Sequence, residues 1–572
     1  IKENHAADEH KSHLLLVPSG ELQRTVADDA QHTLPNFRQG DAIVLYERNA
    51  DTDNVTNKMV FKGNIDYLNE NEICIRLRAT QQNSSVLPSD SLYAIEHDAM
   101  DTTFRSMYQG LYAFMSATKE RRDLLLSQRE PQFDVALDKQ IAEAADDFTR
   151  IALKAKAAKD YFLLVGPPGT GKTSCALKKM VETFYKEEGA QILLLSYTNR
   201  AVDEICKALS SIRPEVDFIR VGSELSCDEN YRDHLIENEL ATCMRRTEVC
   251  ERINRCRILV GTVASISGKP ELFRLKHFDV AIVDEATQIL EPQLLGILCA
   301  KGENGKEGVG KFILIGDHKQ LPAVVLQNTE QSEVYDEALS AVGLKNLKDS
   351  LFERLYRTAR QHTDAHRTYD MLCRQGRMHP EVALFANQAF YEGRLLPVGL
   401  PHQLEDSGNI NRLSFYPSRP EPMGSSAKTN HSEAKIAARL AATVYKEHSE
   451  AFDASRTLGI ITPYRSQIAL IKKEIEVLGI SELNQILIDT VERFQGSERD
   501  VIIYSFCVNY PYQLKFLSNL TEEDGILIDR KLNVALTRAR KQMLLTGVPT
   551  LLERNPLYKS LLKLIESLRN IA

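Results

Sequence analysis

The chain has 572 residues, and its 71 Lys and Arg against 79 Asp and Glu give a formal net charge of −8. This acidic balance argues against a coat-like nucleic-acid binder held by bulk charge, but not against a protein that holds a strand in one local groove. At about 150 residues per domain, the length predicts roughly four units or two large ones with insertions. The longest apolar runs are far shorter than the roughly 18 residues that cross a bilayer, so we expect no membrane-spanning segment and no membrane partner.

The ten cysteines show no paired spacing, which predicts a reducing, cytoplasmic setting without a disulfide framework. Cys227, Cys243, Cys250 and Cys256 contain no CxxC pair, so ordinary thiols are expected there rather than a zinc site. The chain begins at Ile1 without a methionine and without a signal-peptide pattern, and we expect a fragment or a processed form.

Three segments precede the main body of the chain. Residues 1–35 are polar and show no clear period, which predicts a loose leader. Residues 36–103 contain short strand-like runs separated by turn residues, and this spacing indicates a small antiparallel β-barrel or sheet. Residues 104–135 carry apolar side chains at helical spacing and are expected to form a helical stalk.

From about residue 155, short apolar runs alternate with helical segments, which is typical of parallel sheets in an α/β fold. The runs lie at 161–165, 192–195, 258–260, 280–283, 312–315, 458–461, 486–488, 501–504 and 543–545. So many strands are too many for one compact lobe, and we expect two. The first lobe is placed at 136–345, with a short helical insert near 224–256, and the second at 346–572.

The most specific motif follows the first of these strands and precedes a helical segment. Its residues are Gly166, Pro167, Pro168, Gly169, Thr170, Gly171, Lys172 and Thr173. Glycines let backbone N–H groups approach phosphate oxygens, and the helix N-terminus adds a positive end. Lys172 would reach the β- and γ-phosphates and Thr173 would ligate Mg²⁺. The sequence therefore predicts a nucleoside triphosphate site.

A pair of carboxylates ends the strand at 280–283. Asp284 and Glu285 would lie at the carboxyl edge of a parallel sheet, where α/β ligands bind. Asp284 would hold the Mg²⁺ ion and Glu285 would activate the attacking water.

Two arginines lie far downstream of the phosphate loop. Arg377 and Arg538 are expected in the second lobe, so they would reach the γ-phosphate across a cleft. An arginine finger is worth about 10³–10⁵ in rate, so hydrolysis would depend on lobe closure. Taken without the other motifs, each arginine is more often a surface or ion-pair residue.

A series of further segments completes the pattern. In chain order the segments are Gln140, Gly166–Thr173, Ser196–Ala201, Asp284–Gln288, Gly316–Pro322, Gln375–Pro380, Thr462–Tyr464, Phe494–Glu498 and Asn533–Arg540. With these segments the chain resembles the superfamily 1B helicases, in the group that contains the nonsense-mediated-decay RNA helicase and the Okazaki-fragment nuclease–helicase. Residues 37–129 are closer to the nuclease–helicase branch and its bacterial relatives.

The resemblance implies two RecA-like lobes that use ATP and Mg²⁺, and it implies a role for each matching residue. Gln140 would read the adenine edge, Gln320 would sense the γ-phosphate, and Glu498 would contact the nucleotide from the second lobe. The residues expected to line the path of a single strand are Thr198, Asn199, Thr262, Pro463, Tyr464, Arg493 and Gln495. Hydroxyl and amide donors of this kind hold phosphates without reading sequence.

Two positions depart from the family pattern, and a third allows two interpretations. Gly376 stands where the family usually has an aromatic residue that stacks on adenine, a departure that bears on nucleotide selectivity. Glu492 replaces the usual Asp before Phe494, which is a milder change. Tyr464 could stack on a base or could be a structural aromatic beside a proline turn.

We therefore predict an ATP-dependent helicase on single-stranded nucleic acid, most simply DNA, with 5′→3′ travel implied by the resemblance. An RNA helicase, and an ATP-gated clamp that binds a strand without unwinding, are the alternatives. A nuclease would need its own acidic metal ligands with a lysine, and none is evident outside the nucleotide site. A nuclease domain could therefore only lie upstream of Ile1 or in a partner protein.

Overall fold

The computed structural model describes residues 2–3, 13–16, 37, 39–68, 72–79, 86–98, 102–325, 327, 329–361, 364–405, 411–422, 425–523 and 525–569. The chain forms two compact units, residues 1–104 and residues 105–572. Across the described ranges, no helix has both the length and the apolar character needed to cross a membrane.

The first unit is built on a six-stranded sheet in the order β1-β2-β5-β4-β3-β6, and every neighbouring pair is antiparallel. The strands are β1 (Lys2–Glu3), β2 (His13–Leu16), β3 (Ala42–Glu47), β4 (Val60–Leu68), β5 (Ile73–Leu77) and β6 (Tyr93–His97). Ile43, Leu45, Ile65 and Ile75 form its buried core. The antiparallel prediction is confirmed. In the described residues the outer strands β1 and β6 do not pair, so the sheet is open rather than the closed barrel that was the other possibility.

The predicted leader over 1–35 is wrong for two short segments. Strand β2 pairs with β5 in the register Leu14↔Ile75, and β1 pairs with β2. Long-range pairing with a later strand places these residues in the sheet although their own sequence shows no period. The rest of that segment, and the turn expected at 69–71, lie outside the described residues.

Two helices occupy the segment that was expected to be a stalk, α1 (Thr102–Met115) and α2 (Lys119–Leu125). Helix α2 packs into the core of the first lobe through Leu124 and Leu125. The buried Arg121 donates hydrogen bonds from Nη2 to the carbonyl oxygens of Val309 (2.6 Å) and Gly310 (2.9 Å). These bonds satisfy a buried cation and fix the helix on the lobe.

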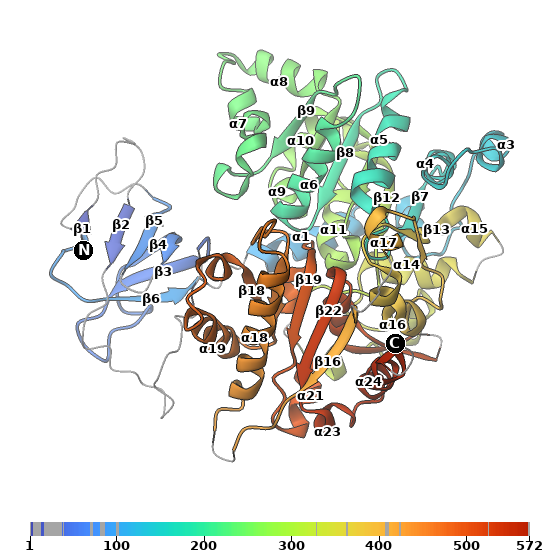
Figure 1. Cartoon of the computed structure of the whole chain (residues 1–572). Helices are drawn as coiled ribbons and strands as arrows, with labels where there is room; N and C mark the ends of the chain where they lie inside the picture. The colour runs from blue at the N-terminus through green and yellow to red at the C-terminus, as the bar shows by residue number, and fades with distance from the viewer. Residues whose placement is uncertain are drawn as a thin grey trace. The chain divides into compact units, whose positions relative to one another are not determined.

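The first lobe contains a seven-stranded, fully parallel sheet in the order β13-β7-β12-β11-β8-β10-β9 (Figure 1). The strands are β7 (Tyr161–Val165), β8 (Ile192–Ser196), β9 (Phe218–Val221), β10 (Ile258–Thr262), β11 (Phe278–Val283), β12 (Val309–Gly316) and β13 (Tyr369–Met371). Its helices are α3 (Asp138–Ala142), α4 (Asp147–Ala157), α5 (Lys178–Tyr185), α6 (Asn199–Ser210), α7 (Ile236–Glu239), α8 (Arg246–Arg255), α9 (Val263–Ser267), α10 (Glu271–Leu275), α11 (Glu291–Leu298), α12 (Thr329–Ser332), α13 (Glu337–Ala341), α14 (Leu351–Ala359) and α15 (Ala365–Thr368). Helices α4, α5 and α6 bury one face of the sheet, and α9, α10, α11 and α14 bury the other. Because both faces are covered, strands such as β7, β8 and β10 are buried throughout and apolar along most of their length.

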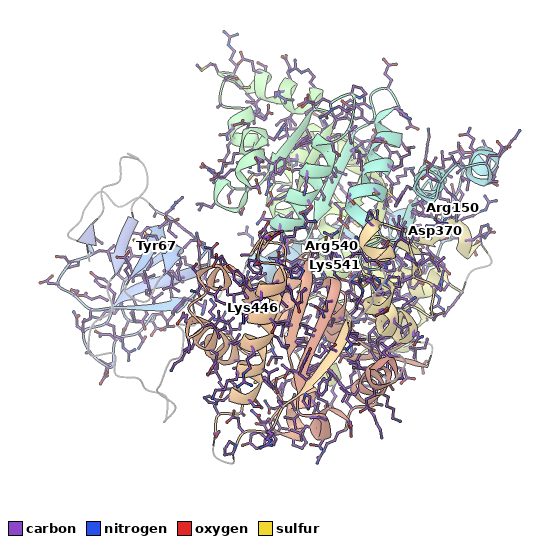
Figure 2. All side chains as sticks on the ribbon, in the orientation of Figure 1. Tyr67, Arg150, Asp370, Lys446, Arg540 and Lys541 are labelled. Atoms are coloured by element: carbon purple, nitrogen blue, oxygen red, sulfur yellow. The ribbon has the colours of Figure 1, made fainter. Side chains whose placement is uncertain are left out.

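The predicted boundary between the lobes at residue 346 is wrong. Strand β13 pairs with β7 through Met371↔Val165, and α14 packs into the core of the first lobe. Arg150 of α4 forms an ion pair with Asp370 of β13, and Lys154 Nζ lies 2.8 Å from the same carboxylate (Figure 2). The first lobe therefore continues through Met371. The insert near 224–256 is helical as predicted, with α7 and α8.

The second lobe contains a five-stranded parallel sheet in the order β16-β22-β19-β17-β18 (Figure 1). Its strands are β16 (Leu413–Pro417), β17 (Leu458–Ile461), β18 (Leu487–Asp489), β19 (Arg499–Ser505) and β22 (Ala539–Gly547), with two small pairs, β14 (Arg374–Gln375) with β15 (Leu396–Pro397) and β20 (Leu520–Glu523) with β21 (Ile526–Asp529). The helices are α16 (Pro380–Phe390), α17 (Pro401–Leu404), α18 (His431–Glu447), α19 (Arg465–Glu476), α20 (Val491–Phe494), α21 (Leu514–Leu517), α22 (Arg530–Leu536), α23 (Pro549–Leu552) and α24 (Pro556–Arg569). Helices α18 and α19 bury one face of the sheet, and α16, α22 and α24 bury the other. The expectation of two parallel-sheet lobes is confirmed.

Candidate nucleotide site and strand path

The predicted phosphate loop connects β7 to a helix that begins at Lys172 with a π-helical turn, Lys172–Leu177, and continues as α5. Gly169 (φ 73°) and Gly171 (φ 77°) adopt left-handed backbone conformations that glycine tolerates without strain. A Cβ on Gly166 would lie 2.0 Å from Cγ of Lys172, so only glycine fits at the start of the loop. The loop has the strand–loop–helix context that the sequence predicted.

Two carboxylates at the end of β11 face this loop. The Lys172 Nζ donates a 3.1 Å hydrogen bond to Oε1 of Glu285, and the Thr173 hydroxyl donates a 2.5 Å bond to Oδ2 of Asp284. Glu285 is a non-glycine residue with φ 53°, a strained backbone conformation that is frequent at functional sites. The Gln288 Nε2 donates to the second oxygen of Glu285 at 2.9 Å and so fixes its orientation.

Burial and mutual proximity set the charges of this group. Burial would lower the pKa of Lys172, but the carboxylates of Glu285 and Asp284 raise it above its ordinary value. Burial and the neighbouring Glu285 raise the pKa of Asp284. Burial also opposes ionisation of Glu285, but Lys172 holds its pKa below the ordinary value. Glu285 is therefore an ionised carboxylate beside a charged lysine.

The residues present fit a magnesium ion. Mg²⁺ prefers hard oxygen ligands from one or two protein groups together with substrate phosphates. The Thr173 hydroxyl and the buried Asp284 carboxylate place two such oxygens 2.5 Å apart at the mouth of the phosphate loop. Thr173 and Asp284 are the two residues that the sequence predicted as metal ligands, and that role stays a prediction.

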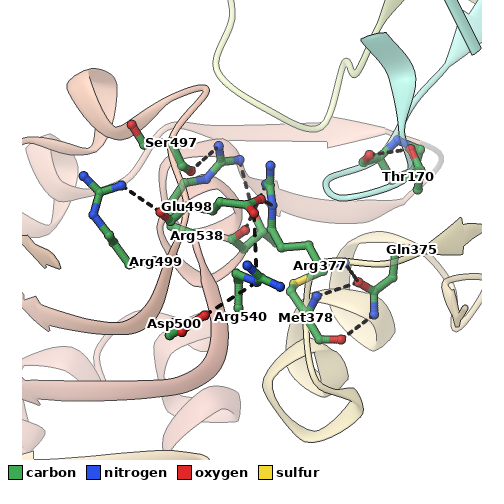
Figure 3. A network of polar contacts seen from close by, with 12 residues as sticks. Thr170, Gln375, Arg377, Met378, Ser497, Glu498, Arg499, Asp500, Arg538 and Arg540 are labelled. Carbon is green, nitrogen blue, oxygen red and sulfur yellow. Dashed lines mark hydrogen bonds and ion pairs between the residues drawn. The ribbon is translucent and has the colours of Figure 1, made fainter. Parts of the chain in front are cut away.

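The second lobe brings Arg377 against the phosphate loop. The Gly376 amide donates a 2.8 Å hydrogen bond to the carbonyl oxygen of Gly169, and a Cβ on Gly169 would lie 2.5 Å from Cβ of Arg377. The Arg377 Nε donates a 2.5 Å bond to Oε2 of Glu498 (Figure 3). Burial opposes the charge on Glu498, but Arg377 lowers its pKa. Glu498 is thus engaged with the arginine that reaches the loop.

Arg538 is buried, with 2% of its surface exposed, and it also contacts the first lobe. Its Nη2 donates a 3.1 Å bond to Oε1 of Gln320, while Nε donates to the Val534 carbonyl (3.0 Å) and Nη1 to the Ser497 carbonyl (3.4 Å; Figure 3). Burial and the neighbouring Arg377 lower the pKa of Arg538 to about 9. The structure therefore places the residues predicted to act on the phosphates around one interlobe surface.

One predicted nucleotide contact lies apart. Gln140 is exposed on the short helix α3 and, within the described residues, makes no hydrogen bond to the phosphate loop. Its proposed reading of adenine stays a prediction.

The predicted strand-path residues of the first lobe lie at the carboxyl ends of adjacent strands. Strands β8 and β10 run side by side with Thr262 opposite Ser196. Thr198 caps α6 by accepting from the Ala201 amide (3.2 Å), and Thr262 caps α9 by accepting from the Ser265 amide (3.0 Å). Asn199 begins α6 beside them.

The second lobe repeats this arrangement at β17 and β18. The amide of Thr462 donates to the Asp489 carbonyl at 3.1 Å. This bond joins the loop that carries Pro463 and Tyr464 to the segment that leads into α20, which contains Arg493 and ends before Gln495. Tyr464 is half-buried, and its hydroxyl accepts a 3.1 Å bond from Nε2 of Gln513. Arg493 is exposed.

Sequence reasoning missed a pair of arginines that meets between these two sets of loops. A Cβ on Gly496, in the second lobe, would lie 3.9 Å from Nε of Arg200, at the start of α6 in the first. Burial and Arg200 together lower the pKa of Arg499. In the part of the chain that the structure describes, neither arginine forms an ion pair with a carboxylate. The side chain of Arg200 lies inside the segment Ser196–Ala201, but nothing in the sequence places Arg499 beside it.

The chain is similar to known proteins over most of its length. Two family models, each described as an AAA domain, match residues 142–249 and 238–328, and residues 347–550. The "DNA replication ATP-dependent helicase/nuclease DNA2" of Bos taurus is 27% identical over 93% of this chain and 50% of its own length. The proteins of the same name from Xenopus laevis and Saccharomyces cerevisiae are 29% and 26% identical over 84% and 78% of this chain, and over 46% and 29% of their own lengths. The chain thus spans about half or less of the length of these curated relatives.

Among solved structures, the arterivirus nonstructural protein 10 helicase in complex with DNA aligns with 70% of this chain and 62% of its own, at 16% identity and a TM-score of 0.34. At this score the likeness is weak, and the parallel sheets of the chain itself define the fold.

Proposed function

We propose that the chain is a superfamily 1B helicase of the group that contains the DNA replication helicase/nucleases. It would be an ATP-dependent motor that moves along single-stranded nucleic acid and separates duplexes. We propose DNA as the strand, because the matched relatives are named for DNA replication. We also propose travel in the 5′→3′ direction, which the resemblance to superfamily 1B helicases implies.

The observation that carries the proposal is the convergence of both lobes on one phosphate loop. Lys172, Thr173 and the carboxylates after β11 come from the first lobe, and Arg377 reaches Gly169 from the second. Arg538 of the second lobe bonds to Gln320 of the first. A simple phosphate-transferring enzyme has no need for cations that arrive from a second sheet.

This arrangement divides the work of hydrolysis between the lobes. The loop amides and Lys172 would hold the β- and γ-phosphates, and Glu285 would accept a proton from the attacking water. When bound, Mg²⁺ at Thr173 and Asp284 would neutralise charge on the phosphates. Arg377 and Arg538 would stabilise the charge that develops on the γ-phosphate, so hydrolysis would proceed only while the lobes are in contact.

Lobe contact also connects the nucleotide to the strand. The predicted strand contacts stand at the carboxyl ends of β8 and β10 in one lobe and of β17 and β18 in the other. A change in the separation of the lobes would change the distance between these two sets of loops, and one set would then move along the strand relative to the other.

Steady-state ATP hydrolysis tests this function. We would measure the rate without polymer, with single-stranded DNA and with single-stranded RNA, using Glu285→Gln as the blank. Strong stimulation by DNA is expected. Greater stimulation by RNA would indicate an RNA helicase instead, and no stimulation by either polymer would contradict the motor and favour an ATP-gated clamp.

The nuclease named in the relatives is not part of this proposal. A nuclease of that kind uses metal ions held by clustered acidic side chains. No group of three or more His, Cys, Asp or Glu residues in the described ranges is placed to hold a metal ion.

A further inference from the structure

A buried polar cluster joins the two lobes beside the nucleotide site. Asp317 and Gln320 come from the first lobe, directly after β12. Tyr391 and Asn533 come from the second lobe. Tyr391 lies at the C-terminal end of α16, and Asn533 lies within α22. All four side chains are buried, with between 0% and 5% of their surface exposed. Buried polar groups of this kind usually have hydrogen-bond partners, and several of the bonds here cross the lobe boundary.

The Tyr391 hydroxyl stands at the centre of the cluster. It donates a 2.7 Å hydrogen bond to Oδ2 of Asp317 and accepts a 2.8 Å bond from Nδ2 of Asn533. The same Asn533 nitrogen donates a 2.7 Å bond to the Lys319 carbonyl of the first lobe. Burial and Asp317 raise the pKa of Tyr391 well above its ordinary value, so the hydroxyl keeps its proton and remains a donor.

These bonds determine how Gln320 presents its amide. Asp317 Oδ2 accepts from the Tyr391 hydroxyl and also from Nε2 of Gln320, at 2.7 Å in each case. With its nitrogen turned toward Asp317, Gln320 must direct its oxygen the other way, and Oε1 accepts the 3.1 Å bond from Nη2 of Arg538. The bond that joins Arg538 to the first lobe therefore depends on Asp317, while two carbonyls of its own lobe hold the other guanidinium nitrogens. The Lys319 amide holds Oδ1 of Asp317 at 3.1 Å, and the Tyr391 hydroxyl from the opposite lobe holds Oδ2.

We propose that Tyr391 is a positioning residue for ATP hydrolysis. When the lobes are in contact, its hydroxyl holds Asp317 and Gln320 in the arrangement that orients Arg538. This inference rests on the proposed function and deepens it. Tyr391 does not touch the nucleotide in this scheme. Its hydroxyl bonds to a residue of each lobe, so the arrangement exists only while the lobes are together.

A structural role alone would have a different consequence. A buried tyrosine that merely filled space would affect stability and leave turnover unchanged. A hydroxyl that orients Arg538 would affect the chemical step and the link between hydrolysis and movement, because Arg538 acts on charge that develops in the transition state. The two roles are separable by measuring kcat and KM independently.

The chain offers two matched controls inside the second lobe. The Tyr558 hydroxyl donates a 2.9 Å bond to Oδ2 of the buried Asp529, so Tyr558→Phe also removes a hydroxyl–carboxylate bond but not one between the lobes. The Tyr504 hydroxyl is buried and has no hydrogen-bond partner in the described residues, so Tyr504→Phe removes a hydroxyl without removing a bond.

The experiment compares Tyr391→Phe with these two controls in the full chain. The readouts are kcat and KM for ATP with and without single-stranded DNA, base pairs separated per ATP hydrolysed, and the Tm. For Tyr391→Phe we expect kcat with DNA to fall about tenfold while KM changes less than about twofold, since one hydrogen bond lost in the transition state is worth about a factor of ten. We also expect fewer base pairs separated per ATP. Both control variants should keep the kcat of the wild-type chain.

A second variant keeps the test independent of Tyr391 itself. Asn533→Ala removes the donor to both the Tyr391 hydroxyl and the Lys319 carbonyl. It should lower kcat in the same direction, and the double variant should fall by less than the product of the two single effects, because both act through one network.

Unchanged kcat and unchanged base pairs per ATP in Tyr391→Phe would overturn the inference, as would an equal loss of kcat in Tyr558→Phe. Neither result would contradict the proposed function, because that function is tested by the stimulation of the wild-type chain by a polymer. If the wild-type chain hydrolyses ATP but no polymer stimulates it, the motor fails, while kcat without polymer still tests Tyr391.

Discussion

The amide nitrogen of Gly376 donates a 2.8 Å hydrogen bond to the carbonyl oxygen of Gly169, although the two glycines belong to different lobes. This bond holds the segment that carries Arg377 directly on the phosphate loop. It also explains why Gly169 has no side chain, since a Cβ there would lie 2.5 Å from Cβ of Arg377. The position of this arginine is thus set by backbone contact before any nucleotide is considered.

Gly169→Ala tests that contact. The substitution places a methyl group against Arg377 and forces a left-handed conformation (φ 73°) on alanine. We expect ATP turnover to fall by about 100-fold or more, because displacing an arginine finger costs several powers of ten in rate. Turnover and the binding of a fluorescent ATP analogue would be measured together.

Gly189→Ala is the matched control. Gly189 has φ 80° and open space around the position of a Cβ. Both variants should lose about 1 kcal/mol of folding free energy from the unfavourable φ, and only Gly169→Ala should lose turnover. Similar turnover in the two variants would show that Arg377 does not need this close approach.

Replacing Glu285 by Gln should separate ATP binding from hydrolysis. Glu285 is ionised because Lys172 lowers its pKa, so it can accept a proton from water, whereas glutamine cannot. We expect kcat to fall by about 10²–10⁴ with ATP binding retained, which a fluorescent ATP analogue and single-turnover hydrolysis would measure. A variant that hydrolyses ATP within a few-fold of the wild-type rate would assign the general base to another residue.

The pair Arg200 and Arg499 should bind backbone phosphate of the strand. These cations meet between the lobes and, as far as the structure describes the chain, have no carboxylate partner within ion-pair distance, so a phosphate would supply the missing charge. Replacing either by Ala should weaken single-stranded DNA binding and reduce the slope of log K against log salt by about 0.7. Fluorescence anisotropy at several salt concentrations measures both quantities.

The control for this pair is Lys446→Ala, which removes an exposed cation from helix α18 (Figure 2). It should change neither the affinity nor the slope by a comparable amount. If all three variants behave alike, net charge rather than the arginine pair accounts for binding.

Glu433 should make the stability of the second lobe depend on pH. It is fully buried and accepts bonds from the Cys507 amide (2.8 Å) and the Ser505 hydroxyl (2.7 Å), and burial raises its pKa to about 7. Since the folded state holds this proton more tightly than the unfolded state does, the stabilisation is complete below about pH 4.5 and is lost as the pH rises through about 7.

Glu433→Gln should remove this loss. A shift of this size corresponds to about 3 kcal/mol, so we expect the variant to be more stable than the wild-type chain at pH 8 and to differ little at pH 5. Unfolding by denaturant at the two pH values measures the difference. An equal pH dependence in both proteins would show that Glu433 stays ionised in the folded state.

The local parts of the fold were predictable and the long-range parts were not. Apolar runs revealed most strands of both parallel sheets because strands buried on both faces need apolar residues throughout. Strand β9 was missed because Arg220 interrupts its run, yet Arg220 is buried and forms an ion pair with Asp203. Strand β13 was missed because it is three residues long, contains Asp370, and exists only through its pairing with β7.

The same division applies to the site. The phosphate loop is one continuous segment, and Asp284 and Glu285 are consecutive residues. Each motif was recognisable from its residue types and its context in the sequence. The contacts of Tyr391 and of Arg499 were not, because they depend on which surfaces of the two lobes meet. Hydrophobic periodicity carries no information about that, since it reports which side of an element is buried and not what lies opposite.

The extra strand of the first sheet has a consequence for how far each arginine can travel. Met371 is fixed beside Val165 in the first lobe, and Arg377 follows it by six residues, which span at most about 20 Å when fully extended. The short connection therefore limits how far Arg377 can move from the sheet that carries the phosphate loop when the second lobe turns. Arg538 has no such tether and leaves with its lobe. An opening of the cleft would thus withdraw the two positive charges from a bound phosphate unequally, and the release of products would begin on the side of Arg538.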